Sequence, residues 1–398
     1  MVLVAVGLFA TAWGLLHHGF YKRDQIVDTP VYERYGEAMA DGKVPYRDFS
    51  VEYPPGALPA FVIPALGRSD GDSDGFRRAF DRMMLICGCA ALLCAGVALR
   101  GLGAGPGRMG AALAFVAFAP LALGSVLLSR YDLWPAALAS AALAALAWGR
   151  LRLGSALLAL GTVTKLYPAA VLPLALIEAW RRGGRREALR CAGIFAGVFA
   201  LVVVPFVALS PGGMRWTLGR QVTRPLQLES LGSSLLLAAH QAFGLGITMR
   251  SGAGSQNLAG ALPATIAVLQ TLVGAAVMIG LWVAYARGPG GAERLVRYSA
   301  AAVCAFVAFD KVLSPQFLIW LIPVVPLVAG RRGLAASALL LLALVVTQLW
   351  FPYRYWDLAL HFDPLASWLV PLRDLLLLGV LAVLLWPSRR RLARPRTT

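Results

Sequence analysis

Residues 191–209 read CAGIFAGVFALVVVPFVAL, nineteen consecutive positions without a charged side chain. As an α-helix this run is about 28 Å long, close to the thickness of the hydrocarbon core of a bilayer. Similar runs recur along the 398-residue chain, in which 59% of residues are hydrophobic and 14% are charged. A soluble domain carries roughly 25% charged residues. The composition therefore excludes a soluble enzyme and indicates a polytopic helical membrane protein.

We expect an all-α fold of about twelve spanning helices in a single domain over residues 1–398. The predicted helices cover 1–20, 83–100, 109–128, 132–149, 153–164, 167–180, 187–209, 260–286, 297–309, 312–330, 333–350 and 368–387. The pairs within 153–180 and 297–330 are compact, so we expect them to be kinked or partly broken. The apolar stretch 54–67 is too short to span and begins with two prolines, which favours a re-entrant or interfacial helix.

The net charge of +17 is not that of a nucleic-acid-binding protein, because the basic residues lie in short segments between apolar runs. Nineteen arginines and three acids fall in the segments 100–108, 150–152, 178–190, 287–297, 331–332 and 389–396. The remaining 18 basic residues (37 minus 19) accompany the remaining 17 acids (20 minus 3) on the opposite side. By the positive-inside rule the arginine-rich side is cytoplasmic, with both termini on it. The five cysteines lie inside apolar runs, so we expect neither a disulfide framework nor a zinc site.

The charge-balanced side carries the features that suggest chemistry. Three connecting segments, 21–82, 210–259 and 351–367, are predicted to lie there, and the first two are long. Isolated charges also stand at helix ends on this side: Arg130, Asp132, Lys165, Asp310 and Lys311. Ionisable groups at membrane depth are costly, so each is a candidate functional residue. Together they predict a polar cavity that opens to the outside.

Within the first of these segments, Thr29-Pro30 predicts a helix start and Gly42 a helix stop. Apolar residues fall on one face of this helix and charged residues on the other, which is typical of a short amphipathic helix on a membrane surface.

Several short motifs on the charge-balanced side resemble those of the GT-C glycosyltransferases, and more narrowly glycosyltransferase family 87. In chain order they are Asp28-Thr29-Pro30-Val31-Tyr32, GKVPYRDF (42–49), VEYPPG (51–56), SRYDLWP (129–135), GTVTKLYP (161–168), RPLQLES (224–230) and KVLSPQF (311–317). The resemblance extends over about residues 21–330. It is specific because the motifs occur in the same order and are all predicted on the same side of the membrane.

This resemblance implies an inverting transferase in a bacterial plasma membrane, with its active site on the extracytoplasmic face. It would pass a sugar from a polyprenyl-phosphate donor to a glycolipid or glycan acceptor. The resemblance to the mannosyltransferases of this family implies that the sugar is mannose. The early acid of the family's D-x-x-x-Y pattern falls on Asp28, with Tyr32 as its partner, and implies a general base. The alternative is that Asp28 only caps the amphipathic helix. Asp24 would be the substitute base if the register differed.

We assign the other candidate residues by their charge. Arg130, Lys165 and Lys311 are candidates for the donor phosphate, Asp132 for a sugar hydroxyl, and Arg224 for a lid or acceptor-binding segment. The structural alternatives are an Arg130–Asp132 ion pair that anchors a helix, an Asp310–Lys311 pair, and a solvated loop around Arg224 and Glu229. Further candidates are Tyr32, Glu52, Tyr53, Asp310, Gln316 and His361.

Other functions stay open at this point. The donor could carry arabinofuranose or glucose instead of mannose. A polymerase or ligase of lipid-linked glycans would share the topology, and a lipid or glycan transporter or flippase is the rival from another class. A transporter should show an internal repeat with paired broken helices, which the sequence lacks. No nucleotide-binding, cofactor or metal motif stands out, and the acidic run Asp70, Asp72 and Asp74 is typical of a solvated loop. The sequence does not give the oligomeric state.

Overall fold

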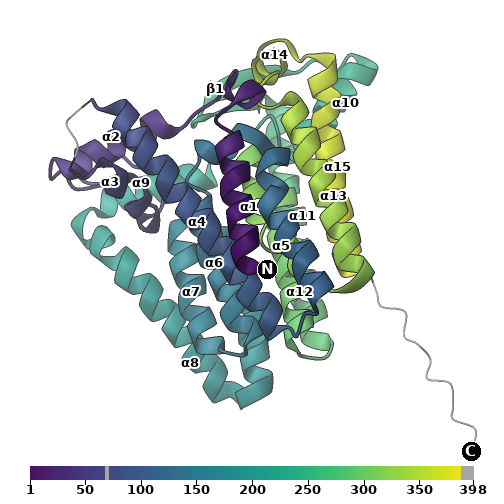
Figure 1. Cartoon of the computed structure of the whole chain (residues 1–398). Coiled ribbons are helices and arrows are strands. Elements are labelled where there is room, and N and C mark those ends of the chain that lie inside the picture. Colours follow the sequence, from purple (N-terminus) through teal and green to yellow (C-terminus); the bar gives the residue numbers. More distant parts are fainter. Residues whose placement is uncertain (68–70, 387–398) are drawn as a thin grey trace, which may run out of the picture.

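The structure is a computed structural model that describes residues 1–67 and 71–386. Most helices run side by side between two ends of the molecule (Figure 1). The α-helices are α1 (Val2–Leu15), α2 (Thr29–Ala40), α3 (Pro59–Ala65), α4 (Ser73–Gly101), α5 (Pro106–Leu123), α6 (Leu133–Ala147), α7 (Leu151–Thr164), α8 (Leu172–Leu209), α9 (Pro211–Val222), α10 (Leu231–Phe243), α11 (Ala261–Arg287), α12 (Ala292–Phe309), α13 (Gly330–Trp350), α14 (Tyr355–His361) and α15 (Pro364–Leu385). The 3₁₀ turns are η1 (Gly19–Lys22), η2 (Pro55–Ala57), η3 (Gly124–Leu128), η4 (Tyr167–Val171), η5 (Pro315–Trp320) and η6 (Val325–Leu327).

Six stretches are long and apolar enough to cross a membrane, which makes this a multi-pass membrane protein. They are Ser73–Gly101, Pro106–Leu128, Tyr167–Leu209, Ala261–Arg287, Gly330–Trp350 and Pro364–Leu385. Shorter apolar helices, among them Val2–Leu15, Leu133–Ala147 and Leu151–Thr164, run between them. The total of twelve crossings stays a prediction. Pro55–Ala65 is short, as expected, and belongs to the same end of the molecule as α2 (Figure 1).

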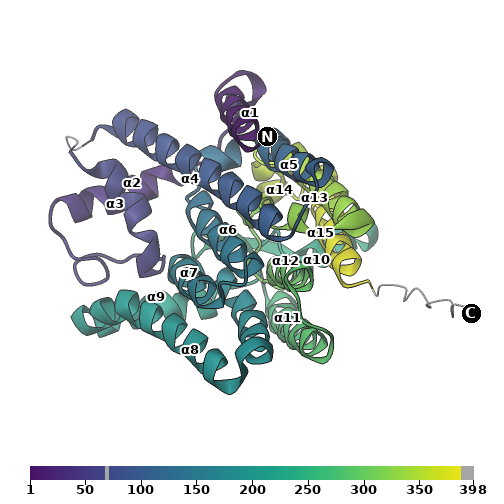
Figure 2. The same cartoon turned by 60° about the horizontal axis from the view of Figure 1, so that its bottom comes forward.

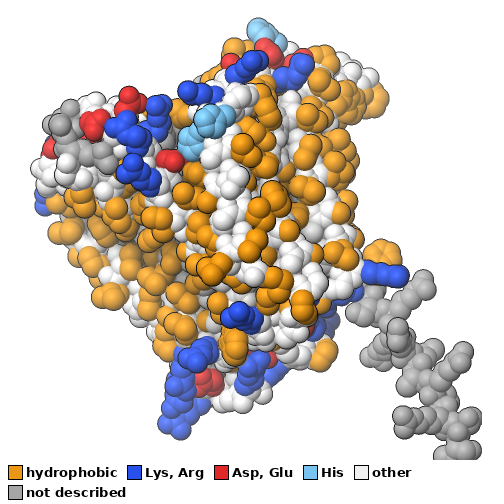
Figure 3. All heavy atoms as spheres, in the orientation of Figure 1, with side chains coloured by type: hydrophobic (Ala, Val, Ile, Leu, Met, Phe, Trp, Pro, Cys, Tyr) orange, Lys and Arg blue, Asp and Glu red, His pale blue; other side chains and the backbone are white. Residues whose placement is uncertain are grey.

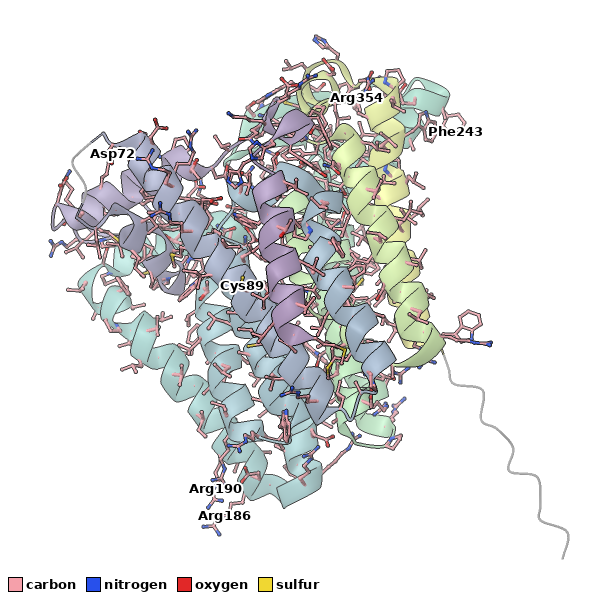
Figure 4. The ribbon with its side chains drawn as sticks, in the orientation of Figure 1. Asp72, Cys89, Arg186, Arg190, Phe243 and Arg354 are labelled. Carbon is pink, nitrogen blue, oxygen red and sulfur yellow. The ribbon has the colours of Figure 1, made fainter. Side chains whose placement is uncertain are left out.

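The two ends of the helix bundle differ in charge (Figure 3). Basic side chains gather where α8 turns, and Arg186 and Arg190 project from that end (Figure 4). We call it the basic end. The other end, which we call the loop end, carries α2, α3, α9, α14 and the loops around them, with acidic and basic side chains mixed. The division agrees with the two sides inferred from charge, although residues 387–398, with five of the arginines counted there, lie outside the described residues.

Two local features differ from the predicted helices, and a third, in α8, agrees with them. The segment 312–330 contains only the 3₁₀ turns η5 and η6, because Pro315, Pro323 and Pro326 remove the backbone donors of a regular helix. α8 reverses direction at Gly183–Gly184, where Gly184 has a φ of 65°, so its two arms correspond to the separate predicted helices 167–180 and 187–209 (Figure 1). The fold is also not purely α-helical: β1 (Thr248–Gly252) and β2 (Ser255–Ala259) pair antiparallel in the second long loop. Ala253 and Gly254 both have positive φ, as a two-residue hairpin turn requires.

The core follows from small residues on the central helices. α6 and α12 lie in the middle of the bundle when it is turned (Figure 2), and their alanine-rich faces are buried. Alanine allows helices to approach closely, which favours packing within a bilayer. One connected cluster of buried residues extends from Ala5 to Leu384. The central helices therefore form a rigid support for the segments at the loop end.

Helix α2 is held against α3 and α4 at the loop end. It starts at Thr29 and ends at Ala40, as predicted, and Thr29, Tyr32, Tyr35 and Gly36 are buried in this contact. A Cβ atom at Gly36 would lie 2.4 Å from the Phe61 carbonyl oxygen, so only glycine permits this approach. The packing fixes the N-terminus of α2, where Asp28 lies.

Candidate functional site

Three of the motifs meet at the backbone of Gly56. Its carbonyl oxygen accepts hydrogen bonds from the Trp134 indole N–H at 3.0 Å and from the Thr164 hydroxyl at 3.3 Å. A Cβ atom at Gly56 would lie 2.7 Å from the Val163 carbonyl oxygen, so the contact requires glycine. VEYPPG, SRYDLWP and GTVTKLYP are thereby joined, although they are far apart in the sequence.

Asp28 is paired with Arg130. An Arg130 guanidinium nitrogen forms an ion pair with Asp28 Oδ1, and the Tyr32 hydroxyl donates to Asp28 Oδ2 at 3.3 Å. The Arg130 side chain is 6% exposed and that of Asp28 is 31% exposed. Asp28 is the N-cap residue of α2, but its side chain makes no capping hydrogen bond. The geometry therefore disfavours the cap as its purpose and leaves a carboxylate that solvent and ligands can reach.

A second ion pair joins Lys165 to Asp132. Lys165 Nζ lies 2.6 Å from Asp132 Oδ1, and the Trp320 indole N–H donates to the same oxygen at 2.7 Å. Asp132 is 1% exposed, and its Oδ2 has no hydrogen-bond partner among the described residues. The predicted Arg130–Asp132 anchor does not form, because the two residues take different partners.

Aromatic rings surround the Lys165 ammonium group. Its nitrogen lies 4.7 Å from the centre of the Tyr131 ring, 5.2 Å from that of Phe317 and 5.1 Å from that of Trp320. Trp320 is stacked between Tyr167 and Phe317. Such ring faces stabilise a cation, most strongly when it is removed from water. The position of the Lys165 charge is thus fixed from several sides.

Tyr32 and Tyr53 belong to an aromatic cluster under the Asp28–Arg130 pair. The Tyr32 ring centre lies 5.8 Å from that of Tyr53 and 5.7 Å from that of Tyr131. Burial raises the pKa of both Tyr32 and Tyr53 well above the ordinary value of 10.0. Both hydroxyls therefore stay protonated at neutral pH, and Tyr32 acts as a donor to Asp28.

The RPLQLES segment packs on KVLSPQF and on the hairpin. The Gln227 N–H donates to the Lys311 carbonyl at 3.0 Å, its side-chain amide donates to the Ser314 hydroxyl at 2.8 Å, and the Leu228 N–H donates to the Gln256 carbonyl at 2.9 Å. Arg224 donates to the Ser255 hydroxyl at 3.0 Å. The segment is therefore anchored, which contradicts a freely solvated loop.

Two acids, Glu229 within this segment and Asp310 near it, have raised pKa values. Glu229 is 1% exposed, and burial raises its pKa to about 7, although Arg373, Arg130 and Arg224 favour its charged form. Burial also raises the pKa of Asp310 to about 6. Lys311 does not pair with Asp310, because its Nζ donates to the Val222 carbonyl at 2.7 Å. Arg130 thus acts electrostatically on Glu229. The position of Glu229 in a loop did not predict this interaction.

The remaining predicted residues lie apart from the Asp28–Arg130 pair. Glu52 is paired with Arg220 at 2.9 Å. Gln316 is half-buried in η5, and His361 is exposed at the end of α14. Within the part of the chain that the structure describes, neither of these two side chains hydrogen-bonds to Asp28 or Arg130. In the same part of the chain, no group of three or more His, Cys, Asp or Glu residues is placed to hold a metal ion.

Sequence reasoning also missed Arg373 and Asp374 in α15. Both are buried in a helix that is otherwise free of charge, and Arg373 donates to the Glu229 backbone carbonyl at 2.6 Å. A charged pair inside a spanning run was the available signal, since such residues are functional candidates by default.

The comparison with protein families identifies the class of protein. The model of "Glycosyltransferase family 87" matches residues 51–315, which are 265 of the 398 residues. The chain therefore belongs to glycosyltransferase family 87, as its motifs indicated, and is a membrane glycosyltransferase. The matched range includes Arg130, Asp132 and Lys165, whereas Asp28 lies before its first residue.

Comparisons with individual proteins add less. No curated protein sequence matches the chain significantly. A crystal structure of ArnT from Cupriavidus metallidurans bound to undecaprenyl phosphate matches with a TM-score of 0.48 and 16% identity, over 96% of this chain and 76% of that one. The oligosaccharyltransferase of Archaeoglobus fulgidus, solved with zinc and sulfate, matches with a TM-score of 0.39 and 14% identity, over 96% of this chain and 50% of that one. Both scores lie below 0.5, so neither likeness defines this fold.

Proposed function

We propose that this glycosyltransferase has a GT-C-type architecture and transfers mannose from a polyprenyl-phosphate donor to a glycolipid or glycan acceptor. The reaction takes place at the loop end, on the extracytoplasmic face, with inversion at the anomeric carbon. The observation that carries the proposal is the position of Asp28. Its carboxylate is partly exposed, is not used as a helix cap and lies against a buried arginine.

In the proposed step the acceptor hydroxyl attacks the anomeric carbon while Asp28 takes the hydroxyl proton. A new bond forms between the acceptor oxygen and this carbon, and the bond from the carbon to the phosphate oxygen breaks. The electron pair of that bond leaves with polyprenyl phosphate, which changes from a diester to a monoester and gains negative charge. Asp28 is left protonated and returns its proton to solvent.

Arg130 is the residue that best suits the developing phosphate charge. A cation placed in advance stabilises such charge more than water does, because it does not have to reorganise. In the structure the Arg130 guanidinium is already occupied by Asp28. A donor phosphate that binds Arg130 therefore weakens this pair and frees the carboxylate, and a carboxylate released from a cation is a stronger base. Donor binding would in this way activate the base.

Lys165 and Asp132 complete the donor site. Lys165 is fixed by Asp132 and by aromatic rings, so it contributes a stationary charge to this site. Asp132 Oδ2 is buried and has no hydrogen-bond partner among the described residues, and we assign it to a hydroxyl of the bound sugar. Arabinofuranose is the alternative sugar. The test is transfer by purified protein from a panel of radiolabelled polyprenyl-phosphate sugars. We expect product with the mannose donor, and product with arabinofuranose alone would replace mannose in the proposal.

A further inference from the structure

The last spanning helix carries a buried charged pair far from either of its ends. Arg373 lies nine residues after Pro364 and twelve before Leu385 in α15, and it is 0% exposed, while Asp374 is 2% exposed. Burying two charges costs several kcal/mol per ion, and an apolar pair of similar size would often be as stable. The pair therefore calls for a role other than stabilising the fold.

The contacts of Arg373 link α15 to the RPLQLES segment. Its Nε donates to Asp374 Oδ1 at 2.7 Å, and its Nη2 donates to the Glu229 backbone carbonyl at 2.6 Å. The guanidinium carbon lies 5.8 Å from the centre of the Trp350 ring on α13. One nitrogen thus orients the arginine on its own helix, while the other holds the loop.

The tethered segment carries two charged residues, Arg224 and Glu229. Arg224 donates to Ser255 through Nη2, while its Nε has no hydrogen-bond partner among the described residues. The carboxylate of Glu229 lies within electrostatic range of both Arg130 and Arg224. Displacement of the Glu229 backbone would therefore shift a charge that acts on Arg130, and would loosen the neighbouring bonds of Gln227 to Lys311 and Ser314.

We infer that Arg373 is a positioning residue, which holds the 224–230 segment through the Glu229 carbonyl so that Glu229 stays within the electrostatic surroundings of Arg130 and Arg224 keeps its contact with Ser255. The inference rests on the proposed function only in taking the surroundings of Arg130 as the active site. Arg373 itself is fully buried and does not touch substrate. It acts by restraining a loop whose other hydrogen bonds to the rest of the described residues come from Gln227, Leu228 and the contacts with the hairpin.

The test compares Arg373→Lys and the double variant Arg373→Met/Asp374→Leu with Arg297→Lys. Arg297, in α12, is a matched control, because its guanidinium also donates to a backbone carbonyl: that of Leu384 in α15, at 3.2 Å and near the basic end. The double variant removes the tether together with its counter-charge, so it leaves no unpaired ion. We expect it to fold, with kcat/KM lower by about 10- to 100-fold, the loss typical of misplaced groups. Arg373→Lys keeps one charged donor and should retain part of the activity, and Arg297→Lys all of it.

Hydrogen exchange separates this inference from the proposed function. The backbone N–H groups of Gln227 and Leu228 should exchange faster in both Arg373 variants than in wild type or Arg297→Lys, whichever substrate the enzyme uses. In a double-mutant cycle, the variant that combines Arg373→Lys with Arg224→Ala should lose much less transition-state stabilisation, measured from kcat/KM, than the sum of the two single losses. Unchanged exchange, full kcat/KM in the double variant, or additive losses would each overturn the positioning role. If hydrogen exchange is faster in the Arg373 variants but the wild-type enzyme transfers no sugar from any polyprenyl-phosphate donor, the proposed donor would be contradicted and the positioning role would stand.

Discussion

The carboxylate of Asp28 and the guanidinium of Arg130 are ion-paired, although 101 residues separate them in the chain. The pair joins the start of α2 to the segment that precedes α6. Of its two members, the arginine is buried and the carboxylate is partly open. This arrangement suits a base that rests on a cation until an anionic ligand competes for it.

Arg130→Gln should impair transfer more than folding. The substitution removes the charge offered to the leaving phosphate, and the loss of one such group typically costs about 100- to 1,000-fold in kcat. Arg130→Lys should recover only part of this, because an ammonium group cannot make the forked contacts of a guanidinium. The measurement is steady-state kinetics with the polyprenyl-phosphate mannose donor. A kcat within twofold of wild type for Arg130→Gln would remove Arg130 from the mechanism.

Lys165→Ala should destabilise the protein, because it leaves Asp132 buried without its counter-ion. Breaking one side of a buried pair costs about 3–5 kcal/mol. Lys165→Ala combined with Asp132→Ala should be less destabilising than the sum of the single variants. Thermal unfolding in nanodiscs measures this coupling. Strictly additive losses would mean that the 2.6 Å contact is not an energetic pair.

Stability should fall as pH rises from about 4.5 to about 7. The pKa of Glu229 is raised from 4.5 to about 7 by burial, so within this window the folded protein keeps a proton that the unfolded chain has lost. Asp310, with its pKa raised to about 6, contributes a change of the same sign. Glu229→Gln should flatten the dependence of the melting temperature on pH, and Asp310→Asn should flatten its lower part. If neither substitution altered the slope, the raised pKa values of these two acids would be contradicted.

Reporter fusions test the proposed face. Fusions after Arg190 and Arg297, at the basic end, should report the cytoplasm, and fusions within 21–53 and 210–259 should report the outside. The physical reason is the excess of arginine in the short segments of the basic end. A cytoplasmic signal from the first loop would place Asp28 on the wrong side for a donor outside the cell.

Sequence patterns predicted much of this arrangement, but not its pairings. The start of α2 at Thr29 and the break at Lys165 followed from Pro30, Pro168 and the polar residues around them. Arg130 could not be assigned to Asp28 rather than to its neighbour Asp132, because the choice depends on how the first loop approaches α6. Glu229 gave no signal, since it is buried where the chain meets Arg373 of the distant helix α15. Two signals in the sequence went unused: the prolines within 315–326, which break a regular helix, and the charges of Arg373 and Asp374 inside an apolar run.

The central claim is that Asp28 is the general base, and Asp28→Asn tests it most directly. Asparagine is nearly isosteric but cannot accept the acceptor's proton, and removal of a general base typically costs about 100- to 10,000-fold in rate. It also leaves Arg130 without a competing charge, so the donor should bind at least as tightly as to wild type. The measurement is therefore donor affinity together with the rate of transfer in one purified variant, with Asp24→Asn as control. We predict tight donor binding with almost no transfer for Asp28→Asn and near-normal transfer for Asp24→Asn. Normal transfer by Asp28→Asn would contradict the account.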